Sequence, residues 1–440
     1  MRFSAVTLGC KVNQYESQSI EGILVSRGHV HVKSGEGCDA CIINTCAITA
    51  ESERKSRQAV RRMRKMEPGA IIAVCGCYSQ LAPEAIEQLG ADLIGGSGDR
   101  VGFALEIERV ALGRVARLQE TRSPETSSPG SRPPATRYED IPPGGGAART
   151  RALLKIQDGC SNYCAYCIVP YVRGRARSLP IARAAENAKL LGERGFREIV
   201  ITGIEISSYG IDLEGSPTLA EAVQEICASA PNARFRLGSL DPSVVTGDFC
   251  LKLRDISNLC DHFHLSLQSG CNDTLQRMGR RYSPGEAAKA IAQLRDLFPG
   301  CGITADLIVG FPGETDAEFA QTLGFIKAAG FSDMHIFPFS ARPGTLAAAM
   351  PGQVGKGVKK ERARTAAETA EGMARSFRLA LIGRTVEVLF ERKRNGFWVG
   401  HAGNYVEVAA INGGARNEIC NVMITSVKDI VAWGEIQPPA

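Results

Sequence analysis

Three cysteines stand within eight residues in the stretch GCSNYCAYCIVPYVRGRARS, Gly159–Ser178. Cys160, Cys164 and Cys167 follow the apolar run ALLKI, which predicts a buried strand. A structural zinc site needs four ligands, and no histidine occurs between Cys167 and His262. Three thiolates can instead bind three corners of a 4Fe–4S cluster and leave the fourth iron open to a ligand that is not protein. The motif therefore predicts a reactive cluster at the carboxyl end of a strand, where α/β barrels place their chemistry.

The length and composition are those of a globular protein with several domains. The 440 residues are too many for one ordinary core, and 44% of them are hydrophobic. There is no apolar run of about eighteen residues and no signal peptide, so we expect a cytoplasmic protein without a membrane segment. Fifteen cysteines in such a chain indicate metal binding or catalysis rather than disulfides. The net charge of +5 is compatible with nucleic acid but does not itself indicate it.

The order of the expected strands and helices divides the chain into four parts. Residues 1–118 alternate strands (RFSAVTL, CIIN, AIIAV) with helices, the first of them at Glu16–Arg27, and predict a doubly wound parallel sheet. Residues 119–150 are rich in Pro, Gly and Ser and predict a linker. Residues 151–378 hold six candidate strands, fewer than a closed barrel of this type requires, so we expect an open, partial β/α barrel. Residues 382–440 predict a small β-barrel.

Basic side chains gather at three places along the chain. Glu51–Glu67 and Lys356–Arg378 each carry seven basic and three acidic residues on a predicted helix. Either helix could present an ordinary solvated face or a surface for nucleic acid. The run ERKR at Glu391–Arg394 stands beside Phe397 and Trp398 on the expected barrel, which indicates a nucleic-acid surface or a surface loop followed by core aromatics.

Three further cysteines come at the ends of predicted strands in the first part. Cys10 ends TLGC, Cys46 follows IINT, and Cys77 follows AVCG. Because the carboxyl ends of the strands in a doubly wound sheet share one edge, these residues can converge into a second three-cysteine site. Cys75 is a rival to Cys77, but Cys75 still belongs to the strand, whereas Cys77 follows the turn glycine Gly76. We interpret the remaining cysteines as structural.

Longer motifs surround both groups of cysteines and extend over essentially the whole chain. They are TLGCKVNQYES and INTCAIT in the first part, IQDGC and CAYCIVPYVRGRARS, HFHLSLQSG and ADLIVGFPGET in the centre, and GNYVEV near the C-terminus. With these motifs the chain resembles the methylthiotransferases among the radical S-adenosylmethionine (SAM) enzymes. TLGCKVNQYES and HIFPFSARPGT favour the branch that acts on threonylcarbamoyladenosine in tRNA. The other branches act on isopentenyladenosine in tRNA or on a ribosomal-protein aspartate.

The resemblance implies a radical reaction with two 4Fe–4S clusters and two SAM molecules, one as methyl donor and one as radical source. Cys160, Cys164 and Cys167 would hold the cluster that cleaves SAM. Cys10, Cys46 and Cys77 would hold the auxiliary cluster, which carries the sulfur. The implied product is the 2-methylthio derivative of N6-threonylcarbamoyladenosine next to the anticodon (tRNA position 37). The implied partners are the anticodon stem-loop of tRNA, bound in part by a C-terminal TRAM domain, and a reductant such as flavodoxin or ferredoxin; we favour a monomer.

Residues near the first cysteine group are implied as contacts of SAM by the same resemblance. They are Tyr166, Arg175, Gly203, Glu205, Ser266, Gln268, Ile308 and Gly310. The motif VITGIE would meet the amino-acid part of SAM, LSLQSG the ribose and IVGFPGE the adenine, although each glycine could also be a simple turn. Arg173, Arg175 and Arg177 follow the cysteines directly, so we favour a grip on the SAM carboxylate or a tRNA phosphate over exposed loop charges.

One alternative belongs to another functional class. The cysteines at 160–167 could form a structural knuckle in a non-catalytic iron–sulfur or zinc protein that binds RNA. The absence of a fourth ligand nearby weighs against zinc. Colour separates the two readings, because an anaerobically purified two-cluster protein is brown and a zinc protein is colourless.

Overall fold

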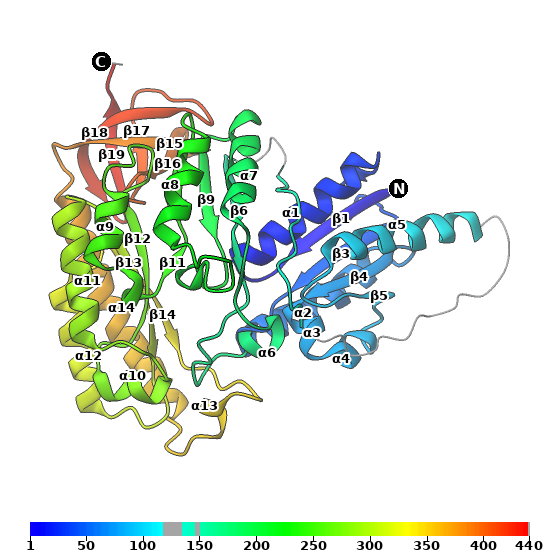
Figure 1. Ribbon diagram of the computed structural model, residues 1–440, viewed down its shortest axis with the longest axis horizontal. Helices are drawn as coiled ribbons and strands as arrows, with labels where there is room; N and C mark the ends of the chain where they lie inside the picture. Colours follow the sequence, from blue (N-terminus) through cyan, green and yellow to red (C-terminus); the bar gives the residue numbers. More distant parts are fainter. Residues whose placement is uncertain (118–133, 146–149, 439–440) are drawn as a thin grey trace.

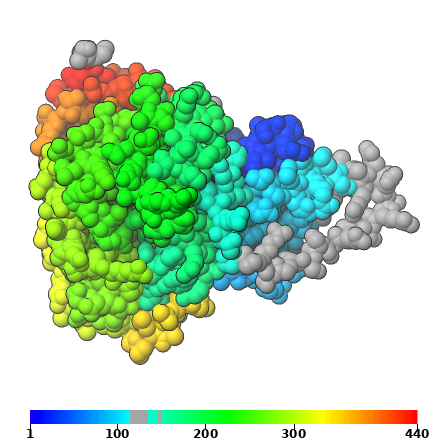
Figure 2. All heavy atoms as spheres, in the orientation of Figure 1, coloured from blue at the N-terminus to red at the C-terminus, as the bar shows by residue number. Residues whose placement is uncertain are grey.

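The computed structural model describes residues 1–117, 134–145 and 150–438. Most of the expected linker therefore lies outside the described residues. The first part of the chain projects from a larger body formed by the central and C-terminal parts (Figures 1 and 2). No helix in the described ranges combines the length and the apolar character needed to cross a membrane.

The first part is a five-stranded parallel sheet covered by helices on both faces, as the sequence predicts. The strand order is β2-β1-β3-β4-β5, with β1 Arg2–Thr7, β2 Val30–His31, β3 Ala40–Thr45, β4 Ile71–Gly76 and β5 Leu93–Ile94. Alternate residues face opposite sides. Ile42 packs with α1 (Lys11–Ser26) and α5 (Arg100–Arg117), whereas Ile43 packs with α2 (Ala50–Met66) and α3 (Cys77–Leu81). The short helix α4, Pro83–Glu87, follows α3.

The central part is an open barrel of parallel strands, again as predicted. One sheet has the order β10-β9-β6 and the next has the order β11-β12-β13-β14. The strands are β6 Arg151–Lys155, β9 Glu198–Thr202, β10 Arg234–Leu237, β11 Ser239–Leu240, β12 His262–Gln268, β13 Gly302–Val309 and β14 Asp333–Pro338. Ile303, Ala305 and Leu307 of β13 belong to the core under the helices, so the residues between them face the inside of the barrel.

Most helices of the central part cover its outer side, away from the first part (Figure 1). The helices of this part include α7 Ile181–Glu193, α8 Leu219–Ser229, α9 Gly247–Leu253, α10 Asn272–Met278, α11 Pro284–Leu297, α12 Asp316–Ala329, α13 Leu346–Ala349 and α14 Lys356–Leu379. Of these, α7 stands beside the first part, and α13 lies at the cysteine loop, where the Ala347 amide donates to the carbonyl of Ala165. Capping boxes begin α8, α11 and α12, in which Thr218, Ser283 and Thr315 each pair with a glutamate three residues later. These local signals explain why the helix starts in this part are readable from the sequence.

The C-terminal part is a closed five-stranded barrel in the order β15-β16-β17-β19-β18. The strands are β15 Thr385–Arg394, β16 Phe397–Ala402, β17 Glu407–Ala410, β18 Ile419–Lys428 and β19 Val431–Ile436. Closure leaves no free sheet edge. The predicted small β-barrel is confirmed.

The described piece of the expected linker, residues 134–145, is not a free connection. The Tyr15 hydroxyl of α1 donates to the carbonyl of Ile141 at 2.8 Å, and the Tyr138 hydroxyl donates to the carbonyl of Lys155 at 2.6 Å. The side chain of Ile141 is buried with Leu153 of β6. This described piece is therefore partly buried, because its few apolar residues lie between the first and central parts.

Candidate active site

The loop with the first three cysteines is closed at its neck by backbone pairing. The short strands β7 (Gln157–Asp158) and β8 (Arg177–Ser178) pair antiparallel, and the Cys160 amide donates to the carbonyl of Gly174 at 3.0 Å. Gly159 has φ +69°, and a Cβ there would lie 2.0 Å from the carbonyl oxygen of Arg175. Only glycine fits at this position, where the two ends of the loop approach each other immediately before the first cysteine.

The three thiols of this loop lie close enough to influence one another. Burial, together with the neighbouring Cys164, raises the pKa of Cys160 to about 11 and that of Cys167 to about 12. Thiols in such a setting stay protonated unless a cation compensates their charge. Bound iron supplies that compensation, which is the behaviour expected of a ligand set.

Arg280, which is not among the residues predicted from the sequence, ties this loop to the barrel. Its guanidinium donates to Asp241 at 2.7 Å and to the carbonyl of Ser266 at 2.9 Å, and it lies 3.6 Å from the Sγ of Cys164. The residue follows Gly279, which ends α10 in the left-handed conformation. The run RMGRRYS contains this helix end, which is the one signal that the sequence offered.

Several residues implied as SAM contacts do come together beside the loop. Tyr166 packs edge-on against Phe311 with ring centroids 6.4 Å apart, and Ile308 contacts the same apolar cluster. Gln268 ends β12 with φ +63°, where the pairing with β13 shifts register. Ser266 stands two residues earlier on β12 and is half-buried. The end of β12 and the end of β13 therefore meet at the cysteine loop.

Glu205 carries a carboxyl group with a raised pKa near the loop. Burial and the neighbouring Asp241 raise its pKa to about 7. Its backbone amide donates to the Gln157 side chain at 2.8 Å. A Cβ at Gly203 would lie 2.9 Å from Gln157, so this glycine is required by close approach rather than by a turn. Gly310 has φ +70°, a backbone conformation that glycine adopts readily in turns and other residues rarely adopt.

The second cysteine group forms where three parallel strands end. Cys10 follows β1, Cys46 follows β3 and Cys77 follows β4. Gly9 (φ +102°) and Gly76 (φ +105°) precede Cys10 and Cys77 in backbone conformations that side chains rarely adopt. A Cβ at Gly9 would lie 2.8 Å from Cys46, and one at Gly76 would lie 2.4 Å from the Asn44 side chain. The two glycines let the strand ends approach one another.

The thiols of the second group also interact with one another, with Cys75 set apart from them. Burial raises the pKa values of Cys10, Cys46 and Cys77, and each has another member of the group among its charged neighbours. Cys75 is fully buried in the apolar core between the sheet and helices α1 and α5. Of the two rivals, Cys77 is therefore the one that lies with Cys46 and Cys10.

The number of thiols in each group bears on the choice between zinc and an iron–sulfur cluster. A structural zinc site takes four ligands, and each group offers three thiols. Three thiolates fit a 4Fe–4S cluster, in which each binds a different iron. The donor sets thus fit iron–sulfur clusters better than a zinc knuckle.

Arg173 connects the two cysteine groups. It ends α6 (Val169–Arg173), directly after the first cysteine loop, and its side chain is fully buried. Its Nε donates to the Sγ of Cys77 at 3.3 Å, its Nη2 to Asn13 at 2.7 Å and its Nη1 to Glu16 at 2.8 Å. One guanidinium therefore spans from the loop of the first site to a thiol of the second.

Five further charged groups surround this arginine in the interface between the first and central parts. They are Glu16, Arg100, Lys155, Asp158 and Arg177. Burial alone would raise the pKa of Glu16, but the surrounding cations hold it well below its usual value. The expected grip of Arg173 and Arg177 on SAM or phosphate is wrong, because both are buried against protein carboxylates and carbonyls. Only Arg175 of the three is exposed.

The basic helices are each neutralised in part. On α14, Arg362, Arg364 and Arg378 pair with acidic side chains, and the exposed Lys356, Lys360 and Arg375 have no ion pair among the described residues. On α2, Arg54, Lys55, Arg57 and Arg64 pair with acidic side chains, and among the described residues the exposed Arg61 and Lys65 do not. On the C-terminal barrel, Lys393 lies over Trp398 at 5.3 Å and Lys428 lies over Trp433 at 5.4 Å. Exposed Phe397 packs edge-on against Trp433, so Phe397, Trp433 and Lys428 lie together on one side of the strands, whereas Lys393 and Trp398 lie on the other.

Comparison with known proteins supplies the family. Residues 154–326 match the radical SAM superfamily, and residues 2–96 match the family described as uncharacterized protein family UPF0004. A threonylcarbamoyladenosine tRNA methylthiotransferase MtaB from Bacillus subtilis is 35% identical over 91% of this chain and 88% of its own length. The chain belongs to the radical SAM methylthiotransferase family. SAM and 4Fe–4S clusters are accordingly its cofactors.

Further relatives in this family divide between two names. The MtaB of Thermotoga maritima is 36% identical over 88% of this chain and 85% of its own length. A tRNA-2-methylthio-N(6)-dimethylallyladenosine synthase of Acetivibrio thermocellus is 30% identical over 98% and 90%. Among solved structures, the radical SAM methyltransferase TsrM of Kitasatospora setae has a TM-score of 0.56 at 13% identity over 79% of this chain and 77% of its own. This last likeness concerns the fold alone.

Proposed function

We propose that this methylthiotransferase converts N6-threonylcarbamoyladenosine next to the anticodon of tRNA to its 2-methylthio derivative. The observation that carries the proposal is the presence of two three-cysteine sites joined by Arg173, which lies 3.3 Å from Cys77. A reaction that replaces an unactivated C–H bond with a C–S bond needs both a radical source and a sulfur source. Two relatives that carry the threonylcarbamoyladenosine name are 35% and 36% identical to the chain, which supports this substrate.

In this proposal Cys160, Cys164 and Cys167 hold the cluster that binds SAM, and Cys10, Cys46 and Cys77 hold the auxiliary cluster. When bound, the first cluster supplies the electron that cleaves SAM and the second carries the sulfur that is transferred. The protein's own task is to position these groups and exclude water.

The side chains beside the first site would divide the recognition of SAM between them. Tyr166 and Ile308 offer apolar surface to the adenine, and Glu205 offers a carboxylate to the ammonium group. Ser266, Gln268, Gly203 and Gly310 bring strand ends and backbone close to the ligand. Arg280 orients the loop through Asp241 and the carbonyl of Ser266. Arg175, the exposed arginine, remains available for a phosphate or carboxylate.

The tRNA would be held by the exposed charges of α2 and by basic and aromatic side chains of the C-terminal barrel. Phosphate contacts of this kind set affinity and register, and aromatic groups stack on unpaired bases. We propose that residues 382–440 act as a TRAM RNA-binding domain, joined to a catalytic part at 151–378 and a cluster-binding part at 1–118. We further propose a cytoplasmic monomer reduced by flavodoxin or ferredoxin.

The experiment is a nucleoside profile by mass spectrometry. The chain is expressed in a bacterium that lacks its own methylthiotransferase for threonylcarbamoyladenosine, and total tRNA is digested and analysed. We expect 2-methylthio-threonylcarbamoyladenosine to return with the wild-type chain and with Cys75→Ala, but not with Cys164→Ala. Absence of the product with a well-expressed wild-type chain contradicts the proposal.

The second candidate substrate is isopentenyladenosine, also called dimethylallyladenosine. It is favoured by relatives that carry this name at 30% to 34% identity. The same experiment in a strain that lacks the corresponding enzyme separates the two, since only one of the 2-methylthio nucleosides should return. A methylthio group on a ribosomal protein instead of on tRNA would favour the third branch.

A further inference from the structure

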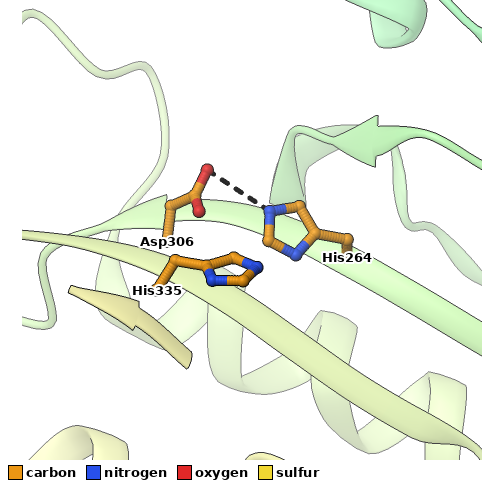
Figure 3. A group of neighbouring side chains, drawn as sticks. All are labelled: His264, Asp306 and His335. Carbon is orange, nitrogen blue, oxygen red and sulfur yellow. Dashed lines mark ion pairs between the residues drawn. The ribbon is translucent and has the colours of Figure 1, made fainter. Parts of the chain in front are cut away.

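Two histidines and an aspartate meet on the inner face of the open barrel. His264 lies on β12, Asp306 on β13 and His335 on β14, and Asp306 stands directly opposite His335 in the strand register (Figure 3). The neighbours of Asp306 along its strand, Ala305 and Leu307, are buried under the outer helices. The three polar side chains therefore face away from the helices, toward the inside of the barrel.

The geometry of this group suits one metal ion. The Nε2 of His264 and an oxygen of Asp306 are 3.3 Å apart, and one donor atom from each of the three residues lies within 4.8 Å of the others. Donors that share an ion at about 2.1 Å stand roughly 3 to 4 Å apart. His335 is exposed, so its side chain has space to adjust toward the other two donors.

A neighbouring hydroxyl orients the first histidine. The Oγ1 of Thr304 lies 2.8 Å from the Nδ1 of His264 and 3.0 Å from the Nε2 of His262. Metal-binding histidines commonly use one ring nitrogen for such a second partner while the other binds the ion. Thr304 occupies the first nitrogen of His264, so the Nε2 is directed at Asp306 and at the space between the three residues.

We propose that His264, Asp306 and His335 bind one divalent transition-metal ion. Two imidazoles and one carboxylate form a donor set that fits zinc or iron(II) and leaves coordination positions open. The open positions would face the same side of the sheet as Ser266 and Ile308, which come two residues later on β12 and β13, about 7 Å along the strands. An oxygen donor of the substrate could fill such a position, a consequence that rests on the proposed function.

The test measures zinc on the intact protein after its iron–sulfur clusters have been reconstituted, so that the cluster cysteines are occupied. Zinc is titrated under anaerobic equilibrium dialysis and counted per chain together with iron by elemental mass spectrometry. We expect one zinc per chain beyond the iron. His335→Gln and Asp306→Asn should each weaken this binding at least roughly tenfold, since even the loss of an outer partner of a metal ligand has that effect.

His31→Gln is the matched control, because His31 is an exposed histidine on strand β2 of the first part. It should bind zinc as the wild type does. His335 is exposed, so its substitution leaves the fold intact even where Asp306→Asn does not. The proposal is overturned if zinc binding is unchanged in both variants, or if the wild type binds no zinc in addition to its iron. The three side chains would then form only a hydrogen-bonded group. Neither readout depends on which nucleoside the enzyme modifies.

Discussion

The two cysteine sites of this protein are built in opposite ways. The first takes all three thiols from one loop of eight residues, Cys160–Cys167, whose neck is closed by β7 and β8. The second takes one thiol from each of three strand ends. Cys46 comes 36 positions after Cys10, and Cys77 comes 31 positions after Cys46. One site is a property of a local segment, and the other exists only when the sheet has formed.

This difference predicts a difference in robustness. Closing one short loop has a small entropic cost, whereas the second site depends on strand register, on two glycines with positive φ and on a buried arginine from another part of the chain. We therefore expect the second site to be lost first when the fold is perturbed. Substitutions that act on only one of the sites can test this comparison.

Loss of a thiol should have the largest effect, with a different outcome at each site. Cys164→Ala should lower SAM cleavage at least roughly 100-fold, and Cys77→Ala should leave cleavage but abolish the methylthio product. The measurements are 5′-deoxyadenosine and 2-methylthio nucleoside formed by the reconstituted protein. Cys75→Ala is the control and should keep both activities, because Cys75 lies in the apolar core. If Cys75→Ala abolishes the methylthio product and Cys77→Ala retains it, then Cys75 rather than Cys77 binds the auxiliary cluster.

Removal of Arg173, which connects the two sites, should have the next largest effect. Arg173→Gln leaves Glu16 and Asp158 with one cation fewer in a buried network, which typically costs about 3 to 5 kcal/mol. Denaturant unfolding should show this loss, and iron analysis should show that the second cluster is depleted before the first. Arg175→Gln is the control from the same loop, and its exposed side chain should leave stability unchanged. Equal iron loss from both sites would contradict the special role of Arg173.

The first site could be predicted from the sequence because its information is local. Spacing, the preceding strand and the absence of a fourth ligand nearby all point to this site within one short segment. The convergence of the second site could also be anticipated, since strand ends share one edge of a parallel sheet. The arginines could not be interpreted in this way. Arg173 and Glu16 are 157 residues apart, and nothing near either of them shows that both are buried.

The start of the first helix shows the same limit. The sequence predicts a helix over Glu16–Arg27, but α1 begins at Lys11. The early residues KVNQY look like a polar loop because only Val12 and Tyr15 among them are apolar. In the structure these two side chains are buried together with Asn13 and Glu16, which contact other polar groups of the interface. Apolar periodicity is a weak signal for a helix whose buried face is partly polar.

A smaller effect is expected from a single methyl group in the second site. Gly76→Ala places a Cβ 2.4 Å from the Asn44 side chain at φ +105°, which we expect to cost roughly 2 kcal/mol. The iron content of the second cluster should fall while SAM cleavage by the first continues. Gly69→Ala is the control, because Gly69 precedes the same strand and has open space around it. If both alanines leave the second cluster intact, the strand ends need no glycine to converge.

The smallest effect is a pH dependence confined to the first site. Burial and Asp241 raise the pKa of Glu205 from its usual value of 4.5 to about 7. In the protein without SAM, protonation of Glu205 therefore stabilises the folded state. This stabilisation is lost as the pH rises from 4.5 through 7. A bound ammonium group favours the ionised carboxylate instead, so SAM should bind more tightly above pH 7 than below it, by up to roughly tenfold between pH 6 and 8. Equilibrium dialysis should show this increase of SAM affinity with pH in the wild type and in the control variant Glu214→Gln, because Glu214 is exposed.

Glu205→Gln should remove the increase with pH, because the amide does not titrate. An increase that persists in Glu205→Gln must come from another group, and Glu205 would then not be the carboxylate that meets the ammonium of SAM.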